Sequence, residues 1–206
     1  MNEIKTELAA FGAVVQGWPL DDIPEELRTL NVCLAAVRRN GFALEYVPAE
    51  MMTPKVCLVA VQNNGRALEH VPDNRRTDAL CLAAVQQDGM ALQFVPASLR
   101  SEDVCLEAVR QAGAALAFVP RDLKTPEICE VAVARDALAL AFVPQRLKTP
   151  AMCSAAVEAC GMLLPWVPEE YRTPEMLNAA VAEANSDVPG GPPEGWEPTM
   201  DAEPEQ

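Results

Sequence analysis

The sequence predicts an all-α fold, an α-solenoid of 24-residue repeats, each holding a short α-helix and a one- to two-turn α or 3-10 element. Cysteine recurs at intervals of 24 residues from Cys33 to Cys153, and proline recurs at the same interval from Pro24 to Pro168. Half of the 206 residues are hydrophobic, which is enough to build a substantial core. We expect the units to stack into a right-handed solenoid.

The repeats predict one solenoid domain over residues 1–187 and a separate C-terminal tail over residues 188–206. The first unit, Lys5–Arg28, is degenerate and carries Ala9 where cysteine is expected. A final half-unit, Thr173–Asp187, has Leu177 in the cysteine column, and we expect it to cap the end of the core with a polar cover. Six regular units lie between them: Thr29–Met52, Thr53–Arg76, Thr77–Arg100, Ser101–Lys124, Thr125–Lys148 and Thr149–Arg172.

Each unit begins with signals for a short helix. In several units a threonine precedes a proline, as in Thr53-Pro54, which suits an N-cap followed by the first helical position. Glu127 and Glu175 place negative charge in a first turn, where the helix dipole favours it. The expected helix of about eleven residues is too short to persist alone in water. We expect it to end at a glycine in the left-handed conformation. These glycines are Gly41, Gly65, Gly89, Gly113 and Gly161, and Ala137 takes the place in the remaining unit.

The second half of each unit is an apolar run that ends in proline, such as Ala115–Pro120. Because proline disfavours helix through the residue before it, we expect a one- or two-turn helix and then a short α or 3-10 turn. The core is predicted from three columns. They are the alanines 36 to 180, the valines 37 to 181 and the leucines 20 to 164, each recurring at the repeat interval.

The pattern of the repeat unit is T-P-x-V-C-L-x-A-V-x-x-x-G-x-A-L-x-F-V-P-x-x-L-R. This pattern resembles a bacterial repeat family, domain of unknown function 4116. The matching residues include Ala84-Val85, Gly89, Ala91-Leu92 and Leu99-Arg100, and the resemblance covers about residues 5–187. The chain is also distantly similar to the leucine-rich variant repeats. The resemblance implies α and 3-10 helices alternating in a curved solenoid, and it implies no active site.

Charge and hydropathy exclude several functional classes. The formal net charge of −14 repels phosphates, so we expect no nucleic acid as partner. No stretch approaches the ~20 apolar residues that span a membrane, and Met1–Gly12 has no signal-peptide pattern. We expect a cytoplasmic bacterial protein, with delivery into a host cell as an alternative. The sequence leaves the oligomeric state open.

The cysteine ladder is interpreted as core packing. Stacked helices lie ~8–10 Å apart, whereas a disulfide needs Cα atoms within ~7 Å. Zinc needs about four clustered ligands, and His70 is the only histidine. We therefore predict no metal, no cofactor and no catalytic residues, and the chain is predicted not to be an enzyme. Cys160 lies outside the ladder and is the thiol expected to be exposed.

Candidate partner-binding residues are those that break the pattern. In the unit Thr53–Arg76, Arg66, His70 and Arg75 replace mostly apolar or aromatic residues and predict a locally basic patch, unless this unit has only drifted. Trp196 lies in the acidic, Pro/Gly-rich tail, which its composition predicts to be disordered; it is a docking motif for a partner or for the solenoid, or is incidental. The column of Arg66 is a contact stripe if exposed and core if covered: Phe42, Met90, Leu138 and Met162.

Two further columns have more than one interpretation. The aromatic column is expected to form a small core under the proline turn rather than a stacking surface for nucleic acid: Tyr46, His70, Phe94, Phe118, Phe142 and Trp166. A basic column ends most units, with Met52 interrupting it: Arg28, Arg76, Arg100, Lys124, Lys148 and Arg172. These cations are expected to be solvated or to bond between repeats, including pairing with nearby acids such as Asp103; the alternative is that they bind an acidic partner.

The function predicted from the architecture is a non-enzymatic protein–protein interaction scaffold that presents variable side chains on a rigid stack. The alternative is a bacterial effector or inhibitor that uses the same surface to bind and regulate a specific enzyme.

Overall fold

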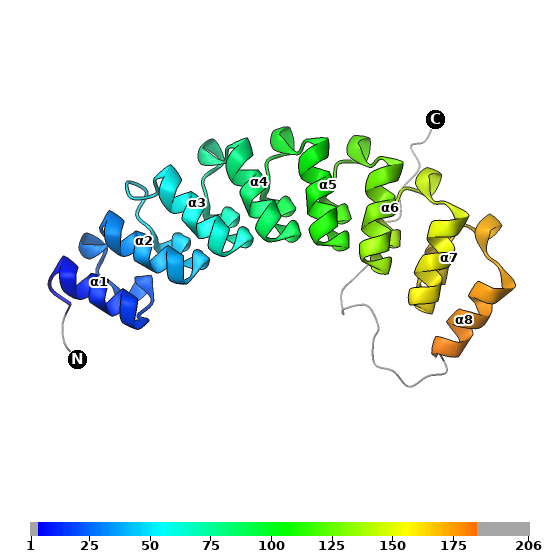
Figure 1. Cartoon of the computed structure of the whole chain (residues 1–206), viewed down its shortest axis with the longest axis horizontal. Coiled ribbons are helices and arrows are strands. Elements are labelled where there is room, and N and C mark those ends of the chain that lie inside the picture. The colour runs from blue at the N-terminus through cyan, green and yellow to red at the C-terminus, as the bar shows by residue number, and fades with distance from the viewer. Residues whose placement is uncertain (1–3, 185–206) are drawn as a thin grey trace, which may run out of the picture.

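The computed structural model describes residues 4–184 and confirms the all-α solenoid. Figure 1 shows the α-helices side by side in a single arc that follows the order of the chain. The tail with Trp196, and the last residues of the predicted half-unit, lie outside the described residues. The α-helices of the described part are α1 (Glu7–Gln16), α2 (Leu30–Arg39), α3 (Pro54–Asn63), α4 (Asp78–Gln87), α5 (Glu102–Gln111), α6 (Pro126–Arg135), α7 (Pro150–Ala159) and α8 (Pro174–Ala184).

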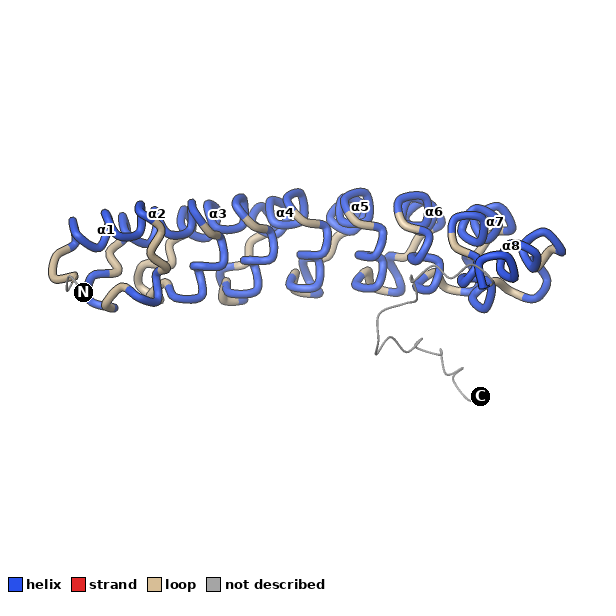
Figure 2. The backbone as a smooth tube through the Cα atoms, turned by 90° about the horizontal axis from the view of Figure 1, so that it is seen from below, coloured by secondary structure: helices blue, strands red, loops and turns tan. Residues whose placement is uncertain are grey.

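The solenoid has two layers, which Figure 2 shows as two rows of helical segments along its length. The α-helices form one row. The second row is formed by 3-10 helices, which run through the predicted apolar segments: η3 (Gly41–Tyr46), η4 (Gly65–His70), η6 (Gly89–Phe94), η8 (Gly113–Phe118), η10 (Ala137–Phe142) and η12 (Gly161–Trp166).

Short 3-10 turns follow the repeating prolines and lead into the next α-helix. In the first unit η1 (Leu20–Asp22) precedes the proline and η2 (Glu25–Leu27) follows it. The later turns are η5 (Asp73–Arg75), η7 (Ala97–Leu99), η9 (Arg121–Leu123), η11 (Gln145–Leu147) and η13 (Glu169–Tyr171).

The α-helices begin as the sequence predicts. Thr53 is the N-cap of α3, its Oγ1 accepts a hydrogen bond from the amide of Val56 at 3.4 Å, and Pro54 is the first helical residue. The same cap recurs through α8, where the amide of Met176 donates to Thr173. Helices α2 to α7 are ten residues long, slightly shorter than expected.

The prediction that the repeating glycines end the helices in the left-handed conformation is wrong. Among the described residues, only Gly17 at the end of α1 has a positive φ, of 112°. Helices α2 to α7 end at a residue in extended conformation, such as Asp88 (φ −145°), and the glycine after it, or Ala137 after α6, begins the 3-10 helix.

The glycine column is required by close packing between units. A Cβ added to Gly41 would lie 2.5 Å from the carbonyl oxygen of Ala60 in the next unit, well inside the 3.0 Å that real Cβ contacts keep. Gly65, Gly89 and Gly113 meet the carbonyls of Ala84, Ala108 and Ala132 in the same way. Glycine therefore lets each 3-10 helix lie directly against the backbone of the next α-helix.

Ala137 is the exception in this column and lies between units six and seven. It begins η10, whereas the other long 3-10 helices begin with glycine.

The predicted columns form the core. The six cysteines of the ladder are free and buried, and the alanine and valine columns are buried from α2 to α7. The end of the stack departs from the prediction. Leu177 and Val181 of α8 are 48% and 59% exposed, and Glu175 and Asn178 of the same helix are exposed as well. Whether the half-unit caps the core stays a prediction, because its last residues lie outside the described part of the chain. In the preceding unit Leu163 is buried in place of an alanine, and Leu164 of the predicted leucine column is only half-buried.

The first unit also differs from its predicted register. Helix α1 starts at Glu7 and α2 at Leu30, an offset one residue shorter than the repeat. Ala10, which is 0% exposed, therefore takes the buried position of the cysteine, and Ala9 is exposed.

The basic column bonds one unit to the next through backbone carbonyls. Arg100 donates from Nε to Val95 at 2.8 Å, from Nη2 to Gln93 at 3.2 Å and from Nη1 to Phe118 of the next unit at 2.7 Å. Arg28 and Arg76 repeat this pattern, while Lys124 and Lys148 each reach the carbonyl of the next aromatic residue. Of the alternatives left open, these bonds show inter-repeat bonding to carbonyls, and Arg76 in addition pairs with Asp73 of its own unit at 2.9 Å.

Candidate functional site

Exposed aromatic side chains gather at the N-terminal end of the solenoid. Among the described residues, the aromatic side chains that are strongly exposed are Phe11, Trp18, Phe42 and Tyr46. The aromatic residues of the later units, from Phe94 to Trp166, are half-buried against the core, as predicted for the aromatic column. Tyr46 departs from that prediction because it is 39% exposed. Aromatic side chains are the commonest anchors of protein interfaces, so this end of the molecule is the strongest candidate site.

The first candidate surface is a groove lined by residues of α1, α2 and α3, which we call the α-groove. Its α1 wall is formed by Leu8, Phe11 and Val15, spaced so that they share one face of the helix. Leu8 is 82% exposed, an unusual state for a leucine in a molecule whose core columns are almost fully buried. The opposite wall comes from α2, and the groove has a volume of about 800 Å³.

Charged side chains border the α-groove. Glu7 lies at its α1 side, where its Oε1 accepts a hydrogen bond of 2.8 Å from Thr29. Arg38 of α2 and Lys55 of α3 line the other side. The apolar floor thus has two cations along one margin, a pattern suited to a partner with an apolar face and an acidic flank.

The α-groove continues as a row of leucines along the same side of the α-layer. They stand directly after the cysteine in four successive units: Leu34, Leu58, Leu82 and Leu106. In the next two units the position is taken by the polar residues Glu130 and Ser154. Leu58 is 38% exposed and borders a smaller hollow of about 380 Å³, which Arg75 also lines. The row of leucines therefore runs through units two to five and is replaced by polar residues in units six and seven.

The second candidate surface lies between the first two units, around Gly17 and the start of η3. We call it the aromatic pocket. It has a volume of about 310 Å³ and is lined by Trp18, Phe42 and Tyr46 together with Arg39 and Asn40.

Carboxylates set the electrostatics of the aromatic pocket. Glu45 and Asp21 belong to its lining, and their negative charges raise the pKa of the Tyr46 phenol above its usual value. The guanidinium of Arg39 lies over Gly17, at the position where a Cβ of that glycine would stand. The pocket therefore combines aromatic faces, hydrogen-bond donors and negative charge.

The structure brings some of the predicted binding residues together and separates others. The rings of Phe42 and His70 meet edge to face, with centroids 6.1 Å apart and planes at 81°. Arg66 is exposed, and its Nε lies 3.7 Å from a carboxylate oxygen of Asp88. Arg75 donates to the carbonyl of Met52, the residue that interrupts the basic column. The three residues of the predicted basic patch therefore have different neighbours.

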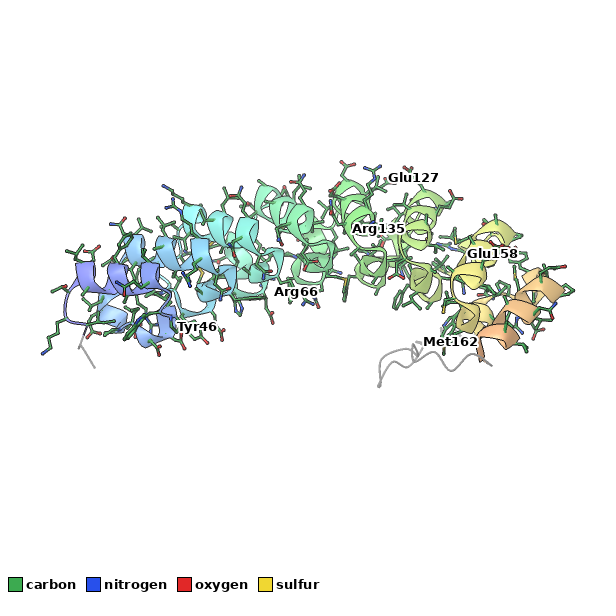
Figure 3. The ribbon with its side chains drawn as sticks, turned by 60° about the horizontal axis from the view of Figure 1, so that its bottom comes forward. Tyr46, Arg66, Glu127, Arg135, Glu158 and Met162 are labelled. Atoms are coloured by element: carbon green, nitrogen blue, oxygen red, sulfur yellow. The ribbon has the colours of Figure 1, made fainter. Side chains whose placement is uncertain are left out.

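The predicted contact stripe runs along the starts of the long 3-10 helices. Phe42, Leu138 and Met162 are exposed and Met90 is half-buried, so the column is a surface feature rather than core. Figure 3 shows Arg66 and Met162 on the same edge of the solenoid as Tyr46, and Glu127 on the opposite edge. Whether this stripe binds a partner stays a prediction, as it does for Trp196.

The thiols of the ladder are not poised for chemistry. Burial raises the pKa of Cys33, Cys81 and Cys105 to about 11, and a nearby arginine only partly offsets this. Such thiols stay protonated at neutral pH, and the thiol is the weak nucleophile of the pair. Cys160, at the end of α7, is half-buried and is the most accessible cysteine, as predicted.

The described residues show neither a metal centre nor a membrane span. Within them, no three His, Cys, Asp or Glu side chains are grouped closely enough to hold a metal ion. None of the described helices has the length and apolar character needed to cross a bilayer.

The most exposed residues of the candidate site were missed in the sequence. Leu8, Phe11, Val15 and Trp18 all belong to the first unit, whose departures from the repeat looked like decay. The signal that could have found them is the position of apolar side chains where the regular units carry polar ones: Val15 stands where α2 has Arg38.

Comparison with known proteins supports the repeat assignment. Residues 30–76 and 79–124 each match the model of one family, described as Domain of unknown function (DUF4116). Each match covers two of the structural units, so the two matches lie in tandem, and the resemblance noted in the sequence is confirmed over these residues. No curated protein and no solved structure matches the chain.

Proposed function

We propose that this tandem-repeat chain is a non-enzymatic protein-interaction scaffold and that the α-groove binds an amphipathic helix of a partner protein. The observation that carries the proposal is the exposed apolar face of α1, where Leu8, Phe11 and Val15 line a groove of about 800 Å³. Contiguous exposed apolar side chains of this kind usually mark a surface that contacts a partner.

The geometry favours a helix as the partner element. The groove lies between two parallel neighbouring α-helices, and its apolar residues are spaced three and four positions apart. A helix with apolar residues at matching intervals would place its side chains between those of α1 and α2. Arg38 and Lys55 along one margin would select a helix with acidic residues on that flank.

The rigidity of the stack supports the same proposal. The α-groove is built on helices fixed by buried columns and by the carbonyl bonds of the basic column, so binding would cost little ordering of the scaffold. The proposal that the chain is not an enzyme is supported by the protonated state of the ladder thiols and by the packing of His70 against Phe42.

The proposal is tested by photo-crosslinking from the α-groove in the cells that produce the protein. A photoreactive residue at Leu8 should yield a discrete adduct, and Leu8→Asp should abolish capture of the same protein. Leu177→Asp is the matched control, because Leu177 is also an exposed leucine, 48% exposed, but lies on α8, at the other end of the stack from the α-groove (Figure 1). Equal capture by both aspartate variants would contradict the proposal.

The identity of the adduct separates the scaffold from the alternative of an enzyme-specific effector. A scaffold predicts several partners that share an amphipathic helix. An effector or inhibitor predicts one enzyme in a stoichiometric complex.

A further inference from the structure

The aromatic pocket is separate from the α-groove. It lies where the 3-10 layer of unit two meets the end of α1. Trp18 is 44% exposed and lines the aromatic pocket with Phe42 and Tyr46. At about 310 Å³, the pocket lies at the lower end of the usual size range of ligand sites. His70 extends the aromatic surface into the third unit through its edge-to-face contact with Phe42.

From this pocket we infer that the solenoid binds an extended, proline-rich and positively charged segment of a partner protein. Three features of the pocket carry the inference: its aromatic faces, its hydrogen-bond donors and its carboxylates.

Aromatic faces and donors suit a polyproline ligand. Proline rings pack on exposed aromatic faces, and a polyproline II segment loses little entropy on binding because it is already extended. Proline has no N–H, so such a segment offers carbonyl acceptors and needs donors from the protein. Trp18 has a donor-only indole N–H, and Asn40 has an amide NH2 group, since its Oδ1 accepts from the amide of Phe42 at 3.1 Å.

The surrounding charges select a basic ligand. Asp21 and Glu45 line the pocket, and Asp22, Glu25 and Glu26 belong to the same first unit. Two cations also stand in this region. Arg28 donates to the carbonyls of Ile23, Asp21 and Tyr46, and Arg39 lies over Gly17. The five carboxylates outnumber these two cations. The negative charges of Glu45 and Asp21 also raise the pKa of the Tyr46 phenol.

The chain's own tail fits this pocket less well than a partner does. Residues 188–206 are rich in proline but carry five acids and no base, so the carboxylates around the pocket would repel them. A second copy of the chain meets the same repulsion, because each copy has a formal charge of −14.

The test measures binding of three synthetic peptides to the full chain by fluorescence anisotropy. The first alternates prolines with arginines, the second replaces the arginines by glutamates, and the third replaces the prolines by alanines. We expect the first peptide alone to bind, and Trp18→Ala to weaken it by about tenfold or more, as loss of an aromatic anchor does. Glu45→Gln should weaken it less and should reduce its dependence on salt.

Phe11→Ala is the matched control, because Phe11 is an exposed aromatic residue of the same unit that lines the α-groove and not the aromatic pocket. It should bind the first peptide like the unaltered chain, while capture through the α-groove should fail. Circular dichroism melts confirm that each variant is folded. Four results would each overturn the inference. The alanine peptide binds as tightly as the first peptide, the glutamate peptide binds, the first peptide does not bind, or Trp18→Ala leaves binding of the first peptide unchanged.

Discussion

The glycine column offers a sharp test of how the units pack. In Gly89→Ala the new methyl group would overlap the carbonyl oxygen of Ala108 and would lie 2.9 Å from the Cβ of Gln111 and 3.0 Å from the amide of Ala112. Two of these three atoms are backbone, so the clash is relieved only if the units move apart or the start of η6 distorts.

The size of the effect follows from two opposing terms. Overpacking of this kind costs about 1–3 kcal/mol. Replacing glycine by alanine restricts the unfolded chain and returns about 0.4–1 kcal/mol. Gly89 has no positive φ, so no left-handed strain is added. Because the clash is mainly with backbone atoms, we take the upper half of that cost, about 2–3 kcal/mol, and expect a net loss of about 1–2.6 kcal/mol in the free energy of unfolding, which lowers the Tm by about 2–10 °C for a domain of this size.

The measurement is urea and thermal unfolding followed by circular dichroism. Gly12→Ala is the control with the opposite sign, since Gly12 lies inside α1 and a Cβ there meets no atom within 4 Å. It should stabilise the protein by about 0.5–1 kcal/mol, because alanine favours helix over glycine. If Gly89→Ala is neutral or stabilising, the close-packing account of the glycine column is refuted.

Three further predictions concern the columns. Arg100→Met removes three hydrogen bonds to the carbonyls of Gln93, Val95 and Phe118 and should cost about 2 kcal/mol in urea unfolding. Met52→Arg restores the missing member of the basic column and should raise the urea midpoint. Stabilisation by Arg100→Met together with destabilisation by Met52→Arg would contradict the bonding role of the basic column. Ala108→Leu, at a position 0% exposed, should overpack the stack by about 1–3 kcal/mol, and an unchanged melt would contradict its core assignment. Cys33, Cys81 and Cys105 have folded-state pKa values of about 11 against an ordinary 9.0, so the unfolded chain ionises first and stability should fall as pH rises from 9 to 11; a triple alanine variant with the same pH dependence would contradict this.

The sequence predicts the solenoid well because its signals repeat. Thr53, Pro54 and their equivalents mark each helix start by local chemistry, and local chemistry needs no knowledge of the tertiary fold. The burial of the cysteines also follows from spacing alone. Their distance along the stack excludes disulfides, and a small apolar residue then belongs in the core.

The reason for the glycine column could not be predicted, because it depends on which way a missing side chain would point. A glycine after a short helix suggests a left-handed cap, and only the placement of Ala60 beside Gly41 shows that the next unit occupies the space. The basic column was ambiguous for a similar reason. The acceptors of Arg100 are carbonyls of its own and the next unit, which have no sequence signature.

The candidate site was largely missed because it lies in the unit that fits the repeat worst. Leu8, Phe11 and Trp18 become informative only after the one-residue shift of α1 is known, since the shift decides which side chains are buried. Phe42 was identified from its column, but its neighbours Trp18 and Tyr46 come from other columns and meet it only in the folded stack.

The most direct test of the interaction scaffold is the reactivity of a cysteine at Leu8 toward maleimide, in a Cys160→Ser background. With Leu8 82% exposed, Leu8→Cys should react rapidly in the purified protein, and Leu177→Cys, at an exposed site on α8, serves as the reference. The account predicts that the Leu8 site is protected inside the cells that produce the protein, whereas the Leu177 site reacts there as it does in the purified sample. If both sites react in cells as fast as they do in the purified protein, nothing occupies the α-groove and the proposed function is contradicted.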